Sequence, residues 1–373
     1  MIRDDFPFFK NNNLIYFDNA ATSQKPYVMI NALNDFYINF NCNIHRGDYS
    51  LSREISKKYD ESRKTVSEYI GAKESEIIFT SGATEGINLV ASVLAKIKKG
   101  NVVVSELEHS SNYFPWKESG LEFRVWKANK DGRLIDNPPI DKNTSIVCIT
   151  GMSNVNGYCP DLEKIIEKAH SFGALVLVDA TQLIVHKKID VHKLDCDFLV
   201  FSAHKLYGPM GLGVLYIKEN LINSFEPYNY GGGMVNRDYS YKTGYEKFEA
   251  GTQNIASILA FKESIDYIKN INIEKIESEL YSYLICKIKM INGISLYENG
   301  NLVMSFSLKN IGSYDIGVLL SNCNIATRCG AHCAYPLLDR IGEENLCRIS
   351  LCFYNTKEEI DYFIEKLNLI ADI

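Results

Sequence analysis

A glycine-containing turn stands where a short apolar run ends and a helical pattern begins. Its residues are Thr80-Ser81-Gly82-Ala83-Thr84-Glu85-Gly86. A turn of this kind at a helix N-terminus leaves backbone N–H groups free, and the Thr84 hydroxyl adds a further donor. The segment predicts a phosphate-binding turn, although strand-to-helix turns also use glycine and threonine for purely structural reasons.

Two further segments follow apolar runs at the point where each run ends. They are Val178-Asp179-Ala180-Thr181-Gln182 and Ser202-Ala203-His204-Lys205. Ligands bind at the carboxyl ends of strands in open α/β sheets. Asp179 can pair there with a protonated ring nitrogen, or it can simply cap a helix. Lys205 can form a Schiff base with an aldehyde, whereas a lone lysine is by default a surface residue.

Together these segments match the requirements of one cofactor. Pyridoxal 5'-phosphate needs a lysine for its aldehyde, an acid for its pyridine nitrogen and a cradle for its phosphate. All three occur in one chain, with Lys205 standing 26 positions after Asp179. The combination indicates pyridoxal-phosphate chemistry more strongly than any segment does alone.

These segments need a scaffold of alternating strands and helices. Short β-rich runs alternate with amphipathic stretches, which is typical of α/β architecture with a mainly parallel sheet. The expected buried strands are Glu76–Thr80, Asn101–Ser105, Glu122–Trp126, Ser145–Thr150, Ala174–Asp179, Asp197–Ser202 and Gly213–Ile217. The expected helices include Glu54–Ile70, Asp161–Phe172, Asn254–Asn270 and a final helix from Thr356.

The C-terminal part has a different organisation. A segment rich in glycine and tyrosine, from Ile222 to Gly251, predicts a long ordered loop of the kind that often carries function. Beyond it the pattern predicts a smaller α+β unit with strands at Leu302–Leu308 and Arg348–Phe353. We expect a large cofactor-binding domain over residues 14–260. Residues 261–373, joined by residues 1–13, form the expected small domain.

Composition narrows the class of protein. The 373 residues are 46% hydrophobic and 23% charged with a net charge of -6, which predicts a globular protein without a basic surface for nucleic acid. No apolar run is long enough to cross a bilayer, and the first thirteen residues lack a signal-peptide core. The ten cysteines include no Cys-x-x-Cys pair. We therefore expect a cytoplasmic location and no metal site.

The chain resembles the class V aminotransferase family of fold-type I pyridoxal-phosphate enzymes, and within it the SufS-type cysteine desulfurase and selenocysteine lyase branch. The resemblance runs from Tyr16-Phe17-Asp18-Asn19-Ala20-Ala21-Thr22 to Arg348-Ile349-Ser350-Leu351. It implies a mainly parallel seven-stranded sheet flanked by helices, followed by a smaller α+β domain.

The resemblance also implies cofactor contacts. Lys205 would bind the cofactor covalently, Asp179 would pair with the pyridine nitrogen, and His109 would stack on the ring. Asn154 and Gln182 would lie near the phenolic oxygen. The phosphate would be held by Ala83, Thr84, Ser202 and His204, with Thr252 of the neighbouring subunit of a homodimer.

A fourth segment resembles the one that carries the nucleophilic cysteine of SufS-type enzymes. It is Arg328-Cys329-Gly330-Ala331-His332-Cys333-Ala334. The resemblance implies that Cys333 in the small domain takes the substrate sulfur, with nearby His332 and Arg328 favouring its thiolate form. The guanidinium of arginine is a planar donor that can form two parallel hydrogen bonds with a carboxylate. The implied substrate contacts are Arg348 for the α-carboxylate, with Arg328, Asn154 and His45.

The implied activity is conversion of L-cysteine to L-alanine, with a persulfide on Cys333 passed to a sulfur-acceptor protein for iron–sulfur cluster assembly or another thiolation pathway. Tyr49, Ser110 and Ala331 stand where the family usually has histidine. These departures leave open another class V enzyme, such as a selenocysteine lyase, C–S lyase or aminotransferase, in which Cys333 is not essential. A cofactor-free scaffold is a third alternative, with Cys333 a packed core cysteine.

Overall fold

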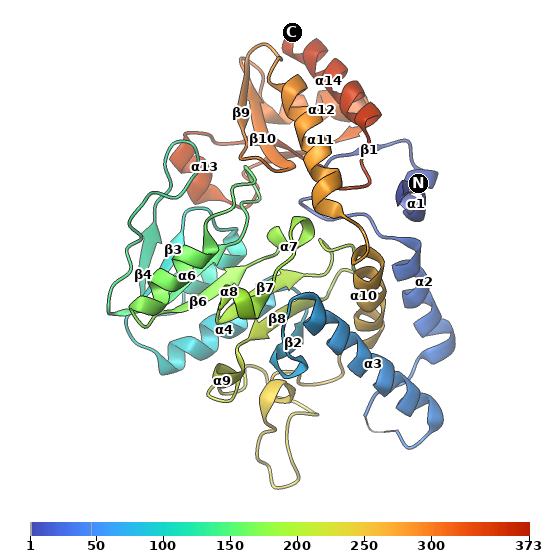
Figure 1. The fold of residues 1–373 in the computed structure, drawn as a ribbon, viewed down its shortest axis with the longest axis vertical. Helices are drawn as coiled ribbons and strands as arrows, with labels where there is room; N and C mark the ends of the chain where they lie inside the picture. Colours follow the sequence, from blue (N-terminus) through green and yellow to red (C-terminus); the bar gives the residue numbers. More distant parts are fainter. Residues whose placement is uncertain (1, 46) are drawn as a thin grey trace.

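The computed structural model describes residues 2–45 and 47–373. Within these residues, a larger unit is built on a seven-stranded sheet and a smaller unit on a four-stranded sheet (Figure 1). The smaller unit lies at the top of Figure 1 and ends in the C-terminal helix α14 (Lys357–Ala371). A short parallel pair, β1 (Ile15–Tyr16) and β11 (Ile325–Ala326), ties the N-terminal segment to the smaller unit.

The large sheet confirms the predicted seven strands, each to within one residue at either end. Its order is β2-β8-β7-β6-β5-β3-β4, and only β8 is antiparallel to its neighbours. The strands are β2 (Ile77–Thr80), β3 (Asn101–Ser105), β4 (Glu122–Trp126), β5 (Thr144–Thr150), β6 (Leu175–Asp179), β7 (Phe198–Ser202) and β8 (Gly213–Ile217).

The large sheet is buried on both faces. In β5, Val147 and Ile149 belong to one apolar core, whereas Ile146 and Cys148 belong to the core on the opposite face. This alternation follows from the two-residue repeat of a strand, and double-sided burial is typical of parallel sheets covered by helices. The helices of this unit are α2 (Tyr27–Asp35), α3 (Ser50–Tyr69), α4 (Ala83–Ile97), α5 (Phe114–Lys117), α6 (Leu162–Ser171), α7 (Leu183–His186), α8 (Val191–Leu194), α9 (Glu219–Ile222) and α10 (Ile255–Ile268).

The predicted ends of α6 and the predicted start of α14 agree with observed caps, whereas α3 begins at Ser50, four residues before the predicted start at Glu54. The Asp161 side chain accepts a hydrogen bond from Lys164 N at the start of α6, and Gly173 follows that helix with a φ of 77°. A side-chain acceptor at the first position and glycine after the last are the expected boundary signals. Thr356 likewise caps α14, with Glu359 completing a capping box.

The smaller unit has an antiparallel sheet of order β12-β13-β10-β9. Its strands are β9 (Ile294–Tyr297), β10 (Val303–Leu308), β12 (Arg328–Gly330) and β13 (Leu346–Ser350), and its other helices are α11 (Ile273–Ile288), α12 (Ser313–Asn322) and α13 (Tyr335–Ile341). These elements, except α13, enclose a third apolar core that also takes in Phe17, whereas Leu337 and Leu338 of α13 belong to a fourth core with Leu107 and Val155. The division into domains at residues 260 and 261 stays a prediction.

One predicted strand is wrong in its bounds. The expected strand Arg348–Phe353 is observed as Leu346–Ser350. The apolar run continues beyond Ser350, but Cys352 N donates to the Asn355 side chain instead of to a neighbouring strand. The apolar residues after Ser350 are therefore buried without being part of the sheet.

The predicted long loop projects from the large unit at the bottom of Figure 1, where it is drawn in yellow. It contains one 3-10 turn, Gly244–Lys247, and is closed at its base by a hydrogen bond from Gly251 N to Gly232 O. No helix of the described residues is both long and apolar enough to span a membrane.

Candidate active site

A cavity of about 190 Å³ opens at the carboxyl ends of the central strands of the large sheet. Asp179 ends β6 and Ser202 ends β7, and both side chains line this cavity. Parallel strands end at one edge of a sheet, so residues far apart in sequence meet there. The predicted residues that line the cavity are Ala83, Thr84, His109, Asn154, Asp179, Gln182, Ser202, His204, Lys205, Arg328 and Arg348.

The N-terminus of α4 forms one end of the cavity. Ala83 N donates to the Ser202 hydroxyl at 2.9 Å, and Thr84 Oγ1 lies 2.8 Å from Ser111 Oγ. A Cβ on Gly213 would lie 2.4 Å from the Cα of Gly82, so the turn approaches β8 closely because residue 213 has no side chain. The helix dipole and the free N–H groups favour an anion such as phosphate at this end.

Lys205 lies half-buried in the cavity, just beyond the end of β7. Burial lowers the pKa of its amine to about 8, and the positive charge of Arg348 contributes, whereas Asp179 acts in the opposite direction. The lower pKa increases the fraction of neutral amine near pH 7, and the neutral amine is the form that attacks an aldehyde.

His109 is held in one orientation at the start of the 3-10 turn Ser110–Asn112. Its Nδ1 accepts a hydrogen bond from Ser111 N at 3.1 Å. Burial and the charge of Lys205 lower the pKa of the imidazole to about 4. The ring is therefore neutral near pH 7, with its proton on Nε2, which leaves a donor available to a ligand.

Several buried polar atoms of cavity-lining residues have no hydrogen-bond partner within the described residues. They are Asn154 Oδ1, Thr181 Oγ1, Gln182 Oε1, His204 Nδ1, both ring nitrogens of His332 and Arg348 Nε. Buried polar atoms normally find partners, so their concentration around one cavity indicates a polar ligand. With an amine, a buried acid and a helix N-terminus, this set of groups fits pyridoxal 5'-phosphate.

Arg348 is a buried cation at the edge of the cavity, on β13. Its guanidinium donates to Asn154 O at 2.9 Å and to Asp18 Oδ1 at 3.1 Å, while its Nε has no partner among the described residues. A guanidinium has five N–H groups, so donors remain for a bound carboxylate. Arg328 stands opposite Arg348 in the β12–β13 pairing and also lines the cavity.

Cys333 lies partly exposed on the loop between β12 and α13; its neighbour His332 lines the cavity, but Cys333 is not among the lining residues. His332 and Cys333 both have left-handed backbone conformations, with φ of 54° and 56°. Their carbonyls are held from the large unit: Asn154 Nδ2 donates to His332 O at 2.8 Å, and the Ser110 N and Oγ both donate to Cys333 O. The strained loop is therefore fixed by residues that surround the cavity.

The surroundings of His332 bear on its expected contribution to the Cys333 thiolate. The side chain is 4% exposed and lines the cavity. Burial, with the charges of Arg348 and Arg328, lowers the pKa of this imidazole to about 3. A neutral ring provides no positive charge near pH 7, so of the two neighbours expected to assist Cys333 only Arg328 carries a charge there.

His45 and Thr252 do not line this cavity. They line a second cavity of about 370 Å³, between the segment that precedes α3 and the loop at residues 232–253. Its wall includes the buried ion pair of Arg63 with Glu249, whose atoms Nη2 and Oε2 lie 2.7 Å apart. The substrate contact predicted for His45 and the contact of Thr252 with a neighbouring subunit's phosphate site stay predictions.

Asp18, Ser111 and Lys25 are among the residues at or near the site for which the sequence predicted no role. Asp18 pairs with Arg348, Ser111 bonds with Thr84, and the Lys25 ammonium donates to His204 O at 2.6 Å. Asp18 lies in the segment Tyr16-Phe17-Asp18-Asn19, which carried the resemblance. Its acidic side chain was the available signal, whereas nothing in the sequence distinguishes Lys25 from a surface lysine.

The model of the aminotransferase class-V family matches residues 15–363. The chain therefore belongs to the class V aminotransferase family, whose members are pyridoxal-phosphate-dependent, and the predicted family is confirmed. Curated relatives are named cysteine desulfurases. The protein from Wigglesworthia glossinidia brevipalpis is 41% identical, with 98% of this chain and 96% of the relative covered. The protein from Enterobacter sp. (strain 638) is 38% identical, with 99% and 97% covered.

Solved structures agree with this placement. The apo structure of a cysteine desulfurase from Thermococcus onnurineus NA1 has a TM-score of 0.93 at 33% identity, with 100% of this chain and 97% of that chain covered. The cysteine desulfurase CsdA from Escherichia coli, in its S-sulfonic acid form, has a TM-score of 0.91 at 31% identity, with 99% and 97% covered.

Proposed function

We propose that this chain is a pyridoxal-phosphate-dependent cysteine desulfurase that forms a persulfide on Cys333. The observation that carries the proposal is the attachment of the Cys333 loop to the Lys205 cavity through Asn154 and Ser110. This attachment supports a role for Cys333 as the nucleophile toward an amino acid that is held in the cavity of Lys205 and Arg348. The curated relatives named cysteine desulfurases support the same activity.

Each end of the cavity has its own task in this proposal. The α4 N-terminus, with Thr84, Ser202 and His204, holds the phosphate, and Lys205 holds the aldehyde carbon. Asp179 pairs with the ring nitrogen, His109 stacks on the ring, and Asn154 and Gln182 approach the phenolic oxygen. When bound, pyridoxal 5'-phosphate supplies an electron sink for the substrate amino acid.

The substrate is held by its charged end. Arg348, supported by Arg328, binds the α-carboxylate of L-cysteine, which directs the substrate thiol toward the Cys333 loop. The Cys333 thiolate attacks the substrate sulfur. A sulfur–sulfur bond forms as the bond from that sulfur to the substrate Cβ breaks, and the carbon skeleton leaves as L-alanine after taking up protons.

The roles of Thr252 and His45, and the removal of the persulfide sulfur, require other protein chains. We propose a homodimer in which Thr252 and His45, on the wall of the second cavity, complete the site of the neighbouring subunit. The persulfide then passes to a sulfur-acceptor protein. A reducing cytoplasm suits Cys333, because the nucleophile has to return to a thiol after each turnover.

The test is mass spectrometry of the purified protein after treatment with L-cysteine. One additional sulfur atom is expected on the peptide that contains Cys333. Cys333→Ala should keep the visible absorption of bound cofactor and lose alanine formation. Cys286→Ala removes an exposed cysteine of α11 and serves as the matched control.

Full alanine production by Cys333→Ala would overturn the role of Cys333. Transfer of the amino group to a keto acid, with no alanine from cysteine, would instead identify another class V activity. Absence of cofactor absorption, with Lys205 unreactive to borohydride, would contradict enzymatic function altogether.

A further inference from the structure

A buried row of polar side chains connects the cavity with the smaller unit. Gln182 Nε2 lies 3.3 Å from His186 Nε2, and His186 Nδ1 lies 2.7 Å from Glu277 Oε2. Gln182 lines the cavity at the start of α7, His186 ends that helix, and Glu277 belongs to α11. All three side chains are buried. Gln182 Oε1 and Glu277 Oε1 have no partner within the described residues.

The protonation state of the His186 imidazole determines which end of the Gln182 amide forms a hydrogen bond with it. A Glu277 carboxylate accepts, so His186 Nδ1 carries a proton. In neutral His186, Nε2 then accepts from the Gln182 amide nitrogen, and the amide oxygen is left for the cavity. In protonated His186, Nε2 donates. The amide then turns by half a rotation, and its NH₂ group is left for the cavity.

The two states suit different ligands. An amide oxygen facing the cavity accepts a hydrogen bond, whereas an NH₂ group donates to an anionic oxygen. The phenolic oxygen of pyridoxal 5'-phosphate is such an anion when ionised, so cofactor binding favours the state with protonated His186. The buried Glu277 carboxylate compensates the charge on His186.

His186 also has access to protons from outside the cavity. It lines a separate hollow of about 390 Å³ that the connection between α10 and α11 borders. The titratable groups around this hollow are Tyr69 of α3, Lys187 and Lys188 after α7, Lys269 after α10 and Glu274 of α11. On the other side of the row, the charge of Glu277 raises the pKa values of Tyr207 and Cys352, although burial is the larger cause in both.

We propose that His186 and Glu277 form a positioning pair, which selects the end of the Gln182 amide that faces the bound cofactor and takes up a proton at His186 when the cofactor binds. The proposal rests on the function proposed above for the Lys205 cavity. Because Glu277 belongs to the smaller unit, the pair also connects that unit to cofactor binding.

The experiment is calorimetric titration of the apo protein with pyridoxal 5'-phosphate in two buffers of different ionisation enthalpy. The number of protons taken up is obtained at several pH values. Wild type should take up as much as about one proton more than His186→Gln, which can hydrogen-bond but cannot carry the charge. His186→Gln should also bind the cofactor roughly ten-fold more weakly, because a charge-assisted hydrogen bond is lost.

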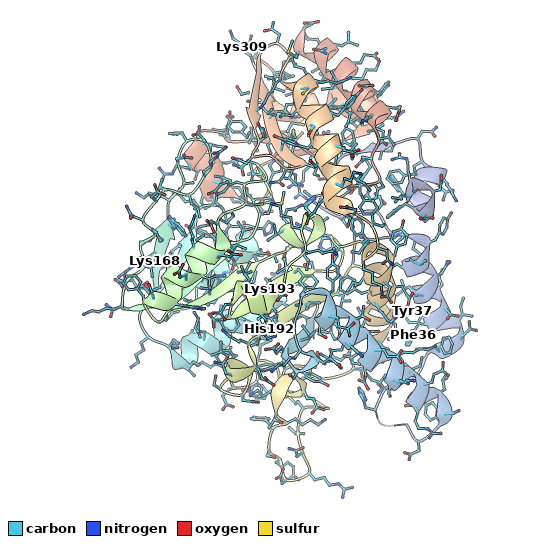
Figure 2. All side chains as sticks on the ribbon, in the orientation of Figure 1. Phe36, Tyr37, Lys168, His192, Lys193 and Lys309 are labelled. Carbon is cyan, nitrogen blue, oxygen red and sulfur yellow. The ribbon has the colours of Figure 1, made fainter. Side chains whose placement is uncertain are left out.

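Two further variants separate positioning from folding. Glu277→Gln keeps a hydrogen-bond partner without the charge, and it should likewise lower the proton uptake. His192→Gln is the matched control. His192 of α8 is labelled in Figure 2, and its Nε2 lies 3.1 Å from Oε2 of Glu76, which precedes β2. Neither residue lines the cavity. The His192→Gln variant should resemble wild type.

Equal proton uptake by wild type, His186→Gln and Glu277→Gln would overturn the proposal. The titration contains no cysteine. A protein that binds cofactor with the expected proton uptake but releases no alanine would therefore contradict the proposed function and support the positioning pair.

Discussion

At the scale of single residues, the basic groups of the site lower one another's pKa values. Burial lowers the pKa values of Lys205, His109 and His204, and the positive charge of Lys205 contributes to the shift of both histidines. The imidazoles are therefore neutral near pH 7, and a useful fraction of the Lys205 amine is neutral. Arg348 keeps its charge because Asp18 lies beside it.

The pKa of Lys205 predicts how cofactor loading depends on pH. Neutral amine reacts with the aldehyde, so loading of the apo protein should accelerate by up to ten-fold per pH unit well below the pKa of about 8 and level off above it. The rate is measured from the appearance of visible absorption. A rate that continues to rise up to the ordinary lysine pKa would contradict the lowered value.

Ser110 gives a second prediction at this scale. Ser110→Ala removes the hydroxyl that donates to Cys333 O at 2.9 Å but keeps the backbone donor. Loss of one such bond costs about 1 kcal/mol, so persulfide formation should slow roughly five-fold with cofactor affinity unchanged.

Ser111→Ala is the comparison for Ser110, because the Ser111 hydroxyl bonds Thr84 at the phosphate end. It should weaken cofactor binding instead. Equal effects of both substitutions on cofactor affinity would show that Ser110 does not act on the Cys333 loop.

Residue identities indicated most of the candidate site. Asp179 and Lys205 were recognisable because a strand end places a charged side chain at the ligand edge of an α/β sheet. The function of Ser110 was not recognisable, since its partner is a backbone carbonyl more than two hundred positions away. The neutral state of His332 was hidden for a similar reason, because burial and neighbouring charge come from the fold.

At the scale of elements, α13 anchors the loop that carries Cys333. Arg340 on this helix donates two hydrogen bonds, of 2.8 and 2.7 Å, to the two carboxylate oxygens of Glu106, which also accepts from Ala128 N. Glu106 lies just beyond the end of β3. The helix after the cysteine is thereby attached to the larger unit.

Removal of this anchor should affect both stability and sulfur transfer. Arg340→Ala leaves a largely buried carboxylate with fewer partners, so the free energy of unfolding should fall by about 1–3 kcal/mol and persulfide formation should slow. Chemical denaturation measures the first effect. Arg124→Ala is the control, because Arg124 pairs with Glu122 and Asp141 away from the loop. A larger loss in the control would disprove a special role for Arg340.

The elements themselves were largely predictable. Except for the edge strand β4, whose residues Glu122 to Val125 are exposed or partly buried, the strands of the large sheet are buried on both faces, and a short apolar run marks each of them. β12 has only three residues and is defined by pairing with β13. No local sequence pattern predicts so short a strand, because it is defined only by its hydrogen bonds with the neighbouring strand.

At the scale of the whole molecule, the two cavities predict cooperation between subunits. Thr252→Glu places a negative charge where we expect the phosphate of the neighbouring subunit, and Lys205→Ala removes the amine. Each variant alone should be inactive. A mixture that exchanges subunits should recover about a quarter of wild-type activity, since half of the dimers contain one intact site of two.

Measurement of alanine formation before and after mixing checks this prediction. Co-purification of two differently tagged variants shows that exchange has occurred. Mixed dimers without activity would place Thr252 in the site of its own subunit, and full activity of Thr252→Glu alone would place it outside any site.

The left-handed conformation of Cys333 has a consequence for how the protein tolerates change. A side chain at a φ of 56° costs about 1 kcal/mol or more, whereas glycine adopts this conformation freely. Glycine is thus the residue that the backbone at position 333 prefers. The cysteine at this position therefore makes the fold less stable than a glycine would. Random substitution selected only for folding would therefore tend to remove the sulfur, and only selection for function would retain it.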